Sequence, residues 1–490
     1  MKNAIIGTLY LLASIAIAGC SAHRSASPVR GLVGLDVDWR GTLKMDSACH
    51  NPLLDFLYTA DPTAVEYEGR LYVYGTNDQQ QHDETRPDSA NTYERINTLA
   101  MMSTRDMVNW TYHGLIPTKK LAPWIIASWA PTICSRPEED GKTHFYLYFS
   151  NSGFGTGVLT ATSPVGPWTS PLDKSIVDAK TPGVGMDVCF DPGVAIDNEG
   201  NGWLAFGGAQ SRLVRLGKDM LSFDSPFVKL PAQHHFEANE LNFIGGRMVY
   251  TYNLDWQPKD DWKMGGQVPS ICSMAYMLAE GDSLQTDSWK YQHHYMRNPG
   301  EDGFEYCNNH THLHKYEGKW YVFGHTMELK RNKGIKGGFR NIIVENIEVD
   351  ESVPSISMSH YTREGVSQIR TINPFEQQEM ETTFATIGIR FEPTEEPGNM
   401  VAMTDSVGAI KVVGVEFDKK ARKLVITAKG KGQMDVRLDN PEGKLIASTL
   451  IDSESMQEHT TSLIPPTVGT HDLVFIFSGK TLQLDGWRMR

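Results

Sequence analysis

Three acidic side chains stand at the start of similar segments that lie far apart in the chain. Asp61, Asp191 and Glu237 each precede a short β-rich run, a glycine-containing turn and an aromatic β run. Carboxyl groups that are crowded together shift each other's pKa, so that one holds a proton near neutral pH while another stays ionised. Such a set can protonate a leaving group and activate water, which is acid–base hydrolysis. Either aspartate alone, each followed by proline, is also typical of a turn.

The same segment pattern occurs five times and predicts the fold. The segments start at Asp61, Ala130, Asp191, Glu237 and His310. Each is typical of strand, tight turn and strand, because β-branched and aromatic residues are bounded by Gly, Asn and Asp. The intervals leave room for two further strands in each unit, and helical periodicity is not evident between them. Five four-stranded units arranged radially form an all-β, five-bladed β-propeller, which we expect over residues 50–370.

A propeller would bring the five starting positions together at one end of its central channel, because equivalent positions of the innermost strands surround one axis. The three carboxyl groups would meet there with the imidazole of His310 and with Trp129, which precedes Ala130. Hydrolysis of a glycosidic bond needs one carboxylic acid to protonate the leaving oxygen and one carboxylate to activate water. A third carboxylate nearby raises the pKa of the acid.

Five motifs, in order and at suitable spacing, resemble one enzyme family. They are "YTADPTAVEYEGRLYVYG", "SWAPTI", "FDPGVAIDNEGNGWLAFGG", "HFEANELNF" and "NNHTHLHKYEGKWYVFGH". From about residue 50 to 350 the chain resembles glycoside hydrolase family 43. The resemblance implies a five-bladed propeller that hydrolyses with inversion. It also implies exo action that releases α-L-arabinofuranose or β-D-xylose from plant cell-wall polysaccharide or oligosaccharide chains.

The resemblance also implies a catalytic role for each acid. Asp61 matches the general base, Glu237 the general acid, and Asp191 the residue that tunes the pKa of the acid and orients the substrate. Glu240 is the rival for the acid, and its alternative role is that of a surface or cross-strand partner. The implied substrate contacts are Trp129, His310 and Arg340.

No cofactor is expected for catalysis. In the family, a histidine at the place of His310 often lies beside a bound calcium ion or water. The family commonly shows two adjacent histidines there, whereas here Thr311 separates His310 from His312. Calcium prefers oxygen ligands, so a hydrogen-bonded histidine of the channel is the alternative for His310.

Residues 371–490 are typical of a separate β-sandwich module, because short β runs alternate there with turns. The segment resembles carbohydrate-binding module family 6, a jelly-roll. By that resemblance Glu379, Glu381 and Asp485 hold a structural calcium ion, and all-oxygen ligation suits calcium. The aromatic residues that stack on sugars in that family are missing, with Gly408 and Ala409 at one such place. We therefore expect a module that is mainly structural or that binds glycan weakly at another site.

Residues 1–20 are typical of a targeting segment. The apolar stretch after Asn3 is too short to span a bilayer comfortably and ends in small residues, as in a signal peptide. The ending "AIAGC" resembles the bacterial lipoprotein box, which implies lipidation of Cys20; ordinary secretory cleavage is the alternative. We expect an exported lipoprotein, periplasmic or anchored at the outer membrane or cell surface, with residues 21–49 as a linker.

Composition narrows the class of partner. Acidic residues outnumber basic ones by 59 to 46, a net charge of −13, which argues against nucleic acid and anionic lipid surfaces. Neutral sugars fit this charge. The cysteines other than Cys20 are five in number and widely spaced, which predicts neither a zinc site nor a disulfide framework. One or two bridges stay open for an exported protein.

Three functions stay open from the sequence: an exo-acting glycosidase, an endo-acting arabinanase with an open cleft, and a non-catalytic surface lipoprotein that binds glycans. Retention of all three acids favours an enzyme, because binding alone does not need a base opposite an acid. Insertions over residues 79–97 and 253–270 would wall the pocket and favour exo action.

Overall fold

The computed structural model describes residues 29–30, 36–37, 42–44, 48–394 and 398–490. Cys20 and the targeting segment lie outside these residues. The described chain is almost entirely β-structure, as expected, and begins with β1 (Val29–Arg30) paired to β2 (Asp36–Val37). Within the same ranges, no helix has the length and apolar character needed to cross a membrane.

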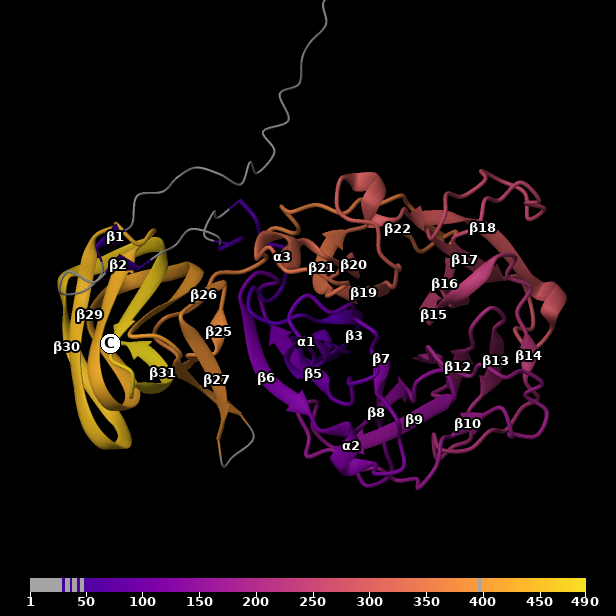
Figure 1. Ribbon diagram of the computed structural model, residues 1–490, viewed down its shortest axis with the longest axis horizontal. Helices are drawn as coiled ribbons and strands as arrows, with labels where there is room; N and C mark the ends of the chain where they lie inside the picture. Colours follow the sequence, from indigo (N-terminus) through magenta and orange to yellow (C-terminus); the bar gives the residue numbers. More distant parts are fainter. Residues whose placement is uncertain (1–28, 31–35, 38–41, 45–47, 395–397) are drawn as a thin grey trace, which may run out of the picture.

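Five antiparallel sheets are arranged around a common centre, which confirms the five-bladed propeller (Figure 1). Blade 1 contains β3 (Ala60–Tyr67), β4 (Arg70–Thr76), β5 (Leu99–Thr104) and β6 (Trp110–Ile116). Blade 2 contains β7 (Trp129–Pro137), β8 (Thr143–Ser150), β9 (Gly155–Ala161) and β10 (Val177–Asp178). Blade 3 contains β11 (Gly193–Ile196), β12 (Gly202–Phe206), β13 (Arg212–Arg215) and β14 (Val228–Lys229). Blade 4 contains β15 (His235–Ile244), β16 (Arg247–Leu254), β17 (Met274–Ala279) and β18 (Trp289–Met296), and blade 5 contains β19 (His312–Tyr316), β20 (Lys319–Thr326) and β21 (Asn341–Asn346).

Apolar side chains fill the space between neighbouring blades. Tyr74 of β4 and Leu147 of β8, for example, lie in the cluster between blades 1 and 2. Similar clusters occupy the other four interfaces. Strands that are covered on both faces are buried almost continuously, and all six residues of β5 are buried. Where blades 3 and 4 approach most closely, a Cβ at Gly193 would lie 2.4 Å from the Cα of Glu240, so only glycine fits.

The expectation of four strands in every blade is wrong for blade 5, which has three among the described residues. The outer edge of β21 is covered instead by the segment before β3. Leu53 N–H donates to the carbonyl oxygen of Ile342 (3.0 Å), and the Asn51 amide bonds both the N–H (3.0 Å) and the carbonyl oxygen (3.2 Å) of Val344. The beginning of the propeller thereby closes the ring on its end.

Short helices and long loops join the strands. The helices are α1 (Asp78–Glu84), α2 (Thr118–Leu121), α3 (Glu328–Asn332), η2 (Thr286–Ser288) and η3 (Pro299–Asp302). Helices α1 and α3 follow the ends of β4 and β20, at the end of the channel where the inner strands begin. A two-stranded sheet of β22 (Val349–Asp350) and β23 (Ser355–Ile356) follows blade 5.

The C-terminal strands form one strongly curved, barrel-like sheet with one large apolar cluster and a smaller one that contains Ala409, Val474 and Ile476. The strands are β24 (Gln378–Glu379), β26 (Ala385–Ile387), β27 (Ile389–Pro393), β28 (Asn399–Met403), β29 (Val407–Leu438), β30 (Leu445–Ser478) and β31 (Gln483–Met489). Several short β runs of the sequence are continuous within β29, which pairs with both β30 and β31. Repeated register shifts along β29 allow so long a strand to bend.

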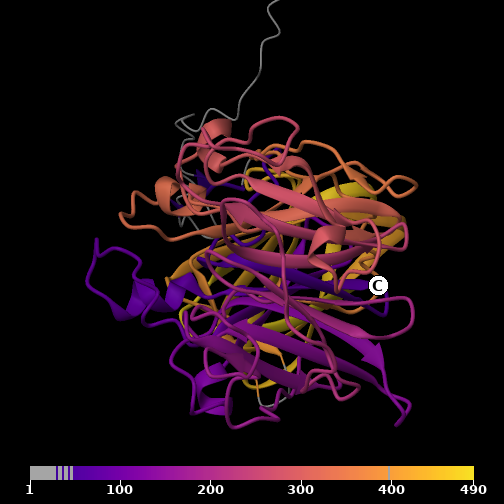
Figure 2. The same ribbon diagram turned by 90° about the vertical axis from the view of Figure 1, so that its right-hand side faces the viewer.

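The C-terminal domain is tied to blade 1. Strand β25 (Thr382–Thr383) pairs with β6 and extends that blade by one strand. The buried carboxylate of Asp55 accepts hydrogen bonds from the N–H and hydroxyl of Thr386, both 2.9 Å. Figure 2, turned by 90°, shows the C-terminal strands behind the blades. The two domains therefore share backbone and buried polar contacts.

Candidate active site

The inner strands begin with an unusual backbone conformation. Asp61 (φ 52°), Ala130 (37°) and Asp191 (49°), which share one position of the repeat, are all left-handed. In blade 4 the left-handed residue is Ala238 (59°), so Glu237 lies one position before the site that the repeat assigns to it. Ala238 takes the left-handed position because its N–H donates a hydrogen bond to Asp191 Oδ2 of the neighbouring blade (2.9 Å).

Side chains of neighbouring blades bond these strand starts to one another. Three left-handed residues donate their N–H to a side chain at the end of a second strand. The pairs are Asp61 to His325 Nδ1 (3.2 Å), Ala130 to Thr76 Oγ1 (2.7 Å) and Asp191 to Ser150 Oγ (2.8 Å). These hydrogen bonds fix the positions of the acids around the channel.

Asp61 is buried and ionised. Its Oδ1 accepts a hydrogen bond from Arg340 Nη1 (2.8 Å), and its Oδ2 accepts one from Thr76 Oγ1 (2.7 Å). Burial raises the pKa of Asp61, but Arg340, His310, His325 and the Thr76 hydroxyl together outweigh burial and hold the pKa below its ordinary value. Asp61 is therefore a carboxylate throughout the neutral range.

Asp191 lies across from Asp61, with His310 between them. His310 Nδ1 is 3.7 Å from Asp61 Oδ1 and 3.8 Å from Asp191 Oδ2. Ser150 Oγ donates to Asp191 Oδ1 (3.2 Å), in addition to the bond from Ala238. Burial raises the pKa of Asp191 to about 7; His310 opposes the rise, and the carboxylates of Glu237 and Asp61 add to it.

Glu237 is partly exposed and accepts one hydrogen bond, from Asn308 Nδ2 (3.0 Å). Desolvation raises the pKa of Glu237 to about 7; the Asn308 amide and Arg340 lower it, and the charge of Asp61 raises it. Asp191 receives two hydrogen bonds that stabilise its ionised form, whereas Glu237 receives one. Of these two acids, Glu237 is therefore the one that holds the proton near neutral pH.

Arg340 is a buried partner of carboxylates. Besides Asp61 it bonds Asp78, the first residue of α1, through Nε and Nη2, both at 2.9 Å. Its guanidinium also lies over the ring of Tyr93, 5.0 Å from the centroid. The guanidinium therefore holds the base carboxylate and an aromatic side chain in one cluster.

Trp129 and Tyr93 lie side by side at this end of the channel. The Trp129 indole N–H donates to the carbonyl oxygen of Tyr93 (3.0 Å), and the two rings meet edge to face at 6.1 Å. Arg340 acts to lower the pKa of Tyr93, but burial and the charges of Asp78, Asp61 and Glu237 raise it to about 12. The phenol is thus neutral and can donate a hydrogen bond.

Glu240 has a structural position, as a buried partner of the next blade rather than the surface or cross-strand partner named as the alternative to its acid role. It is buried, its Oε1 lies 2.7 Å from His312 Nδ1, and both its carboxylate oxygens accept from the Leu313 N–H (3.2 and 3.3 Å). These contacts tie blade 4 to blade 5. Glu240 therefore stands apart from the acids that face the channel end.

Asn308, Tyr93 and Asp78 are site residues that the sequence predictions did not name. Asn308 immediately precedes the Asn309–His310 pair of the fifth motif, and Asp78 and Tyr93 belong to the connection that includes the first insertion. Asn308 is the first residue of the fifth motif, and this was the available indication for it. Nothing in the pattern distinguished Tyr93 from other loop residues.

In the C-terminal domain, Glu379, Glu381 and Asp485 lie near one another and away from this site. The Met380 N–H donates to the carbonyl oxygen of Asp485 (2.9 Å). Burial, followed by the charges of Glu379 and Asp485, raises the pKa of Glu381 to about 8. Glu381 Oε2 is buried without a hydrogen-bond partner. Three acids and one orphaned carboxylate oxygen fit a hard cation, although no group of three His, Cys, Asp or Glu side chains in the described ranges is assembled as a metal site.

Comparisons with known proteins identify the family of this chain. The model of the family "Glycosyl hydrolases family 43" matches residues 49–352. An arabinoxylan arabinofuranohydrolase of Bacillus subtilis is 31% identical over 477 residues, which cover 88% of this chain and 89% of that protein. One from Paenibacillus polymyxa is 29% identical over 483 residues, covering 89% of this chain and 74% of that protein.

Solved structures show the same similarity. The crystal structure of a family 43 arabinoxylan arabinofuranohydrolase from Bacillus subtilis, in complex with cellotetraose, superposes with a TM-score of 0.84 at 30% identity. The superposed region covers 91% of this chain and 99% of the Bacillus subtilis chain. An α-L-arabinofuranosidase from Clostridium thermocellum superposes with a TM-score of 0.51 at 28% identity, covering 64% of this chain and 97% of that one.

Replacement of Arg340 by Met tests the ion pairs beneath the site. The change leaves Asp61 and Asp78 buried without a cation, and we expect the free energy of unfolding to fall by about 3–5 kcal/mol at neutral pH. Arg340 lowers the pKa of Asp61 in the folded state. The ion pair between them therefore stabilises the folded protein at pH values above the unfolded-state pKa of Asp61. This stabilisation is lost as the pH falls through the folded-state pKa. The deficit should therefore shrink toward acid pH, as measured by urea unfolding across a pH series.

Arg331→Met is the matched control, because Arg331 is half-exposed and 3.6 Å from Glu328. It should change stability by less than about 0.5 kcal/mol. Equal stability of Arg340→Met and Arg331→Met at neutral pH would contradict the account.

Proposed function

Because the chain belongs to glycosyl hydrolases family 43, whose members are inverting glycosidases, we propose that it removes α-L-arabinofuranosyl branches from arabinoxylan. It is a glycoside hydrolase of the arabinofuranosidase or xylosidase type. The observation that carries the proposal is the set of three acids at one end of the channel, of which Asp61 bonds a guanidinium and Glu237 bonds a neutral amide. Similarity over most of the chain to two arabinoxylan arabinofuranohydrolases supports this substrate.

We assign the base role to Asp61. Its carboxylate is ionised and fixed by Arg340 and Thr76, so it can take a proton from a water molecule. The water oxygen attacks the anomeric carbon while the bond from that carbon to the leaving oxygen breaks. A single displacement of this kind inverts the configuration of the sugar.

We assign the acid role to Glu237, which donates its proton to the leaving oxygen in the same step. Its raised pKa keeps it protonated near neutral pH, and its partial exposure leaves its carboxyl group accessible to a glycosidic oxygen. Asp191 is a positioning residue in this scheme. It binds the Ala238 N–H, next to Glu237 in the chain, and its negative charge opposes ionisation of Glu237.

Trp129, Tyr93 and His310 would contact the sugar ring. Trp129 is partly exposed and oriented by its bond to Tyr93, which suits an apolar wall against one sugar face. His310 lies between Asp61 and Asp191, where its ring can bond sugar hydroxyls. Arg340 acts on the substrate through Asp61 and Tyr93 rather than as a free cation.

We further propose that the C-terminal domain binds a structural calcium ion through Glu379, Glu381 and Asp485. The unpartnered Glu381 Oε2 and the raised pKa of all three acids support this. Glu381 Oε1 accepts a hydrogen bond from the Asn399 N–H (3.3 Å). The backbone carbonyl oxygen of Glu381 accepts one from the Tyr112 N–H of blade 1 (3.4 Å). A bound cation would therefore stiffen the junction between the two domains.

Replacement of Glu237 by Gln and of Asp61 by Asn tests the proposed reaction on arabinoxylan. We expect the wild-type protein to release arabinose and Glu237→Gln to lose about 10²–10⁴-fold in kcat. On an aryl α-L-arabinofuranoside with a good leaving group the loss should be much smaller, because that leaving group needs no proton. Asp61→Asn should lose a similar factor on both substrates, because water is no longer activated.

Glu240→Gln is the matched control for Glu237→Gln. It should affect stability, through the lost contacts with His312 and Leu313, without discriminating between leaving groups. Equal losses for Glu237→Gln on the two substrates would overturn the acid assignment. Failure of the wild-type protein to release arabinose from arabinoxylan would overturn the proposed substrate.

Calcium removal tests the proposed ion in the C-terminal domain. A ligand that binds only the folded state raises the melting temperature of the protein. Calcium at about 100 times its Kd should raise the Tm by roughly 5–10 °C over the chelated protein, as measured by scanning calorimetry. Glu381→Gln should abolish this difference, whereas Glu442→Gln, at an exposed turn residue, should retain it. Identical Tm values with calcium and with chelator would refute the site.

A further inference from the structure

Asn308 is held from two sides by groups that also hold the base. Its backbone carbonyl oxygen accepts a hydrogen bond from His325 Nε2 (2.8 Å), and its side-chain Oδ1 accepts one from Arg340 Nη1 (3.5 Å). The same two residues bond Asp61: His325 Nδ1 accepts from its N–H (3.2 Å), and Arg340 Nη1 donates to its Oδ1 (2.8 Å). The position of Asn308 is therefore fixed relative to the base carboxylate.

The guanidinium decides which way the Asn308 amide points. Every N–H group of an arginine is a donor and none can accept, so the amide atom that faces Arg340 must be the oxygen. The NH₂ group of the same planar amide then points away from Arg340, and its Nδ2 donates to Glu237 Oε1 (3.0 Å). One amide thus joins the ion pair of the base to the side chain of the acid, in a single hydrogen-bond direction.

This direction decides where the proton of Glu237 lies. An amide NH₂ donates and cannot accept, so Oε1 must offer a lone pair to Asn308. In a neutral carboxyl group the carbonyl oxygen is the better acceptor, and the other oxygen carries the proton. The proton of Glu237 is therefore on Oε2. In the described part of the chain no side chain or backbone group bonds this atom, and Glu237 is partly exposed.

We propose that Asn308 is a positioning residue for the acid, which confines the transferable proton of Glu237 to Oε2 and stabilises the carboxylate that remains after the transfer. This proposal rests on the proposed function. As the glycosidic bond breaks, the bond between Oε2 and its proton breaks too, and the proton joins the leaving oxygen. The electron pair stays on the Glu237 carboxylate, where the hydrogen bond from Asn308 becomes charge-assisted and stronger. The charge of Arg340 polarises the amide and adds to this effect.

Other charged or titratable groups also act on Glu237. They come from the strand starts, from the connection after α1 and from the segments before β17 and β21. A substitution at Asn308 removes none of them, so a change in the behaviour of Glu237 can be assigned to the amide. These groups are Asp61, Asp191, Arg340, Tyr93 and Cys272.

The test compares Asn308→Asp with Asn308→Ala. Asn308→Asp keeps the size of the side chain and an oxygen that faces Arg340, but it replaces the donor with an acceptor. The proton of Glu237 would then be held between two carboxyl groups. We expect kcat on arabinoxylan to fall about 10–100-fold with little change in KM, at least as far as in Asn308→Ala. On the aryl α-L-arabinofuranoside with a good leaving group the loss should be much smaller.

The pH profile of Asn308→Ala gives a second readout, which a loss of shape alone does not move. The amide stabilises the ionised form of Glu237, so its removal raises the pKa of Glu237. The alkaline limb of kcat/KM on arabinoxylan reports loss of the acid's proton. This limb should therefore move upward by about one pH unit.

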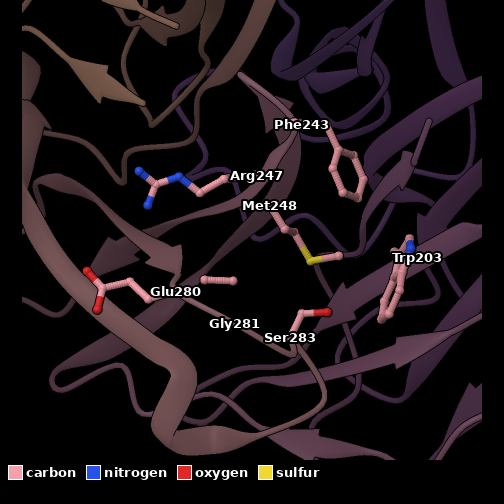
Figure 3. A pocket seen from close by; sticks show the side chains of 9 residues that line it. Trp203, Phe243, Arg247, Met248, Glu280, Gly281 and Ser283 are labelled. Atoms are coloured by element: carbon pink, nitrogen blue, oxygen red, sulfur yellow. The ribbon is translucent and has the colours of Figure 1, made fainter. Parts of the chain in front are cut away.

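Asn242→Asp is the matched control, because the same pair of groups meets again in blade 4. Asn242 Nδ2 donates to Glu240 Oε1 (3.1 Å), and Glu240 has no role in the proposed reaction. The next residue, Phe243, lines a pocket of about 420 Å³ at the opposite end of β15 from Glu237 (Figure 3). Asn242→Asp should keep the wild-type ratio of kcat on the two substrates and the wild-type alkaline limb.

Three results would overturn the proposal and leave the proposed function intact. They are a much smaller loss for Asn308→Asp than for Asn308→Ala, equal losses on the two substrates, and an unchanged alkaline limb in Asn308→Ala. If the wild-type protein hydrolyses neither substrate, the proposed function fails, and a carbon-13 NMR titration of the Glu237 carboxyl group decides the role of Asn308. A higher pKa of Glu237 in Asn308→Ala than in the wild type supports that role, and equal pKa values overturn it.

Discussion

Four carboxyl groups share the end of the propeller channel with one guanidinium, and the chemistry of the site follows from that imbalance. Arg340 bonds Asp61 and Asp78 and so stabilises their ionised forms. Asp191 and Glu237 do not bond the guanidinium, and burial raises the pKa of each to about 7. Two hydrogen bonds stabilise the ionised form of Asp191, so Glu237 is the acid that retains the proton. One base and one acid thus coexist at the same pH because the single guanidinium bonds one side of the site.

The propeller contributes the rigidity that this arrangement needs. Asp61, Asp191 and Glu237 belong to three different blades, so the distances between them depend on how the blades pack. Hydrogen bonds from the strand starts to Thr76, Ser150 and His325 join neighbouring blades at the level of the acids. One step further along the strands, Glu240 bonds the Leu313 N–H, and Gly193 allows blades 3 and 4 to approach closely. Apolar clusters between all five blades then hold the ring together.

The fold and the three acids could be predicted because both depend on local patterns. Strand, turn and strand repeat five times, and the acids stand where those repeats begin. The strand count of blade 5 could not be predicted, since the segment around Asn51 covers its edge from the other end of the propeller. The shift of Glu237 by one position depends on a backbone turn at Ala238 that the pattern does not encode. Tyr93 and Asn308 act through loop conformations, which hydrophobic periodicity does not report.

The most direct test of the central claim is a carbon-13 NMR titration of protein labelled at the side-chain carboxyl carbons of glutamate, with Glu237→Gln used to assign the Glu237 resonance. Burial, together with the charge imbalance, predicts that Glu237 titrates with a pKa of about 7, well above the ordinary 4.5 of a glutamate. The same titration on aspartate-labelled protein should give Asp61 a pKa below the ordinary 3.8 of an aspartate. A Glu237 resonance that titrates near 4.5 would contradict the account.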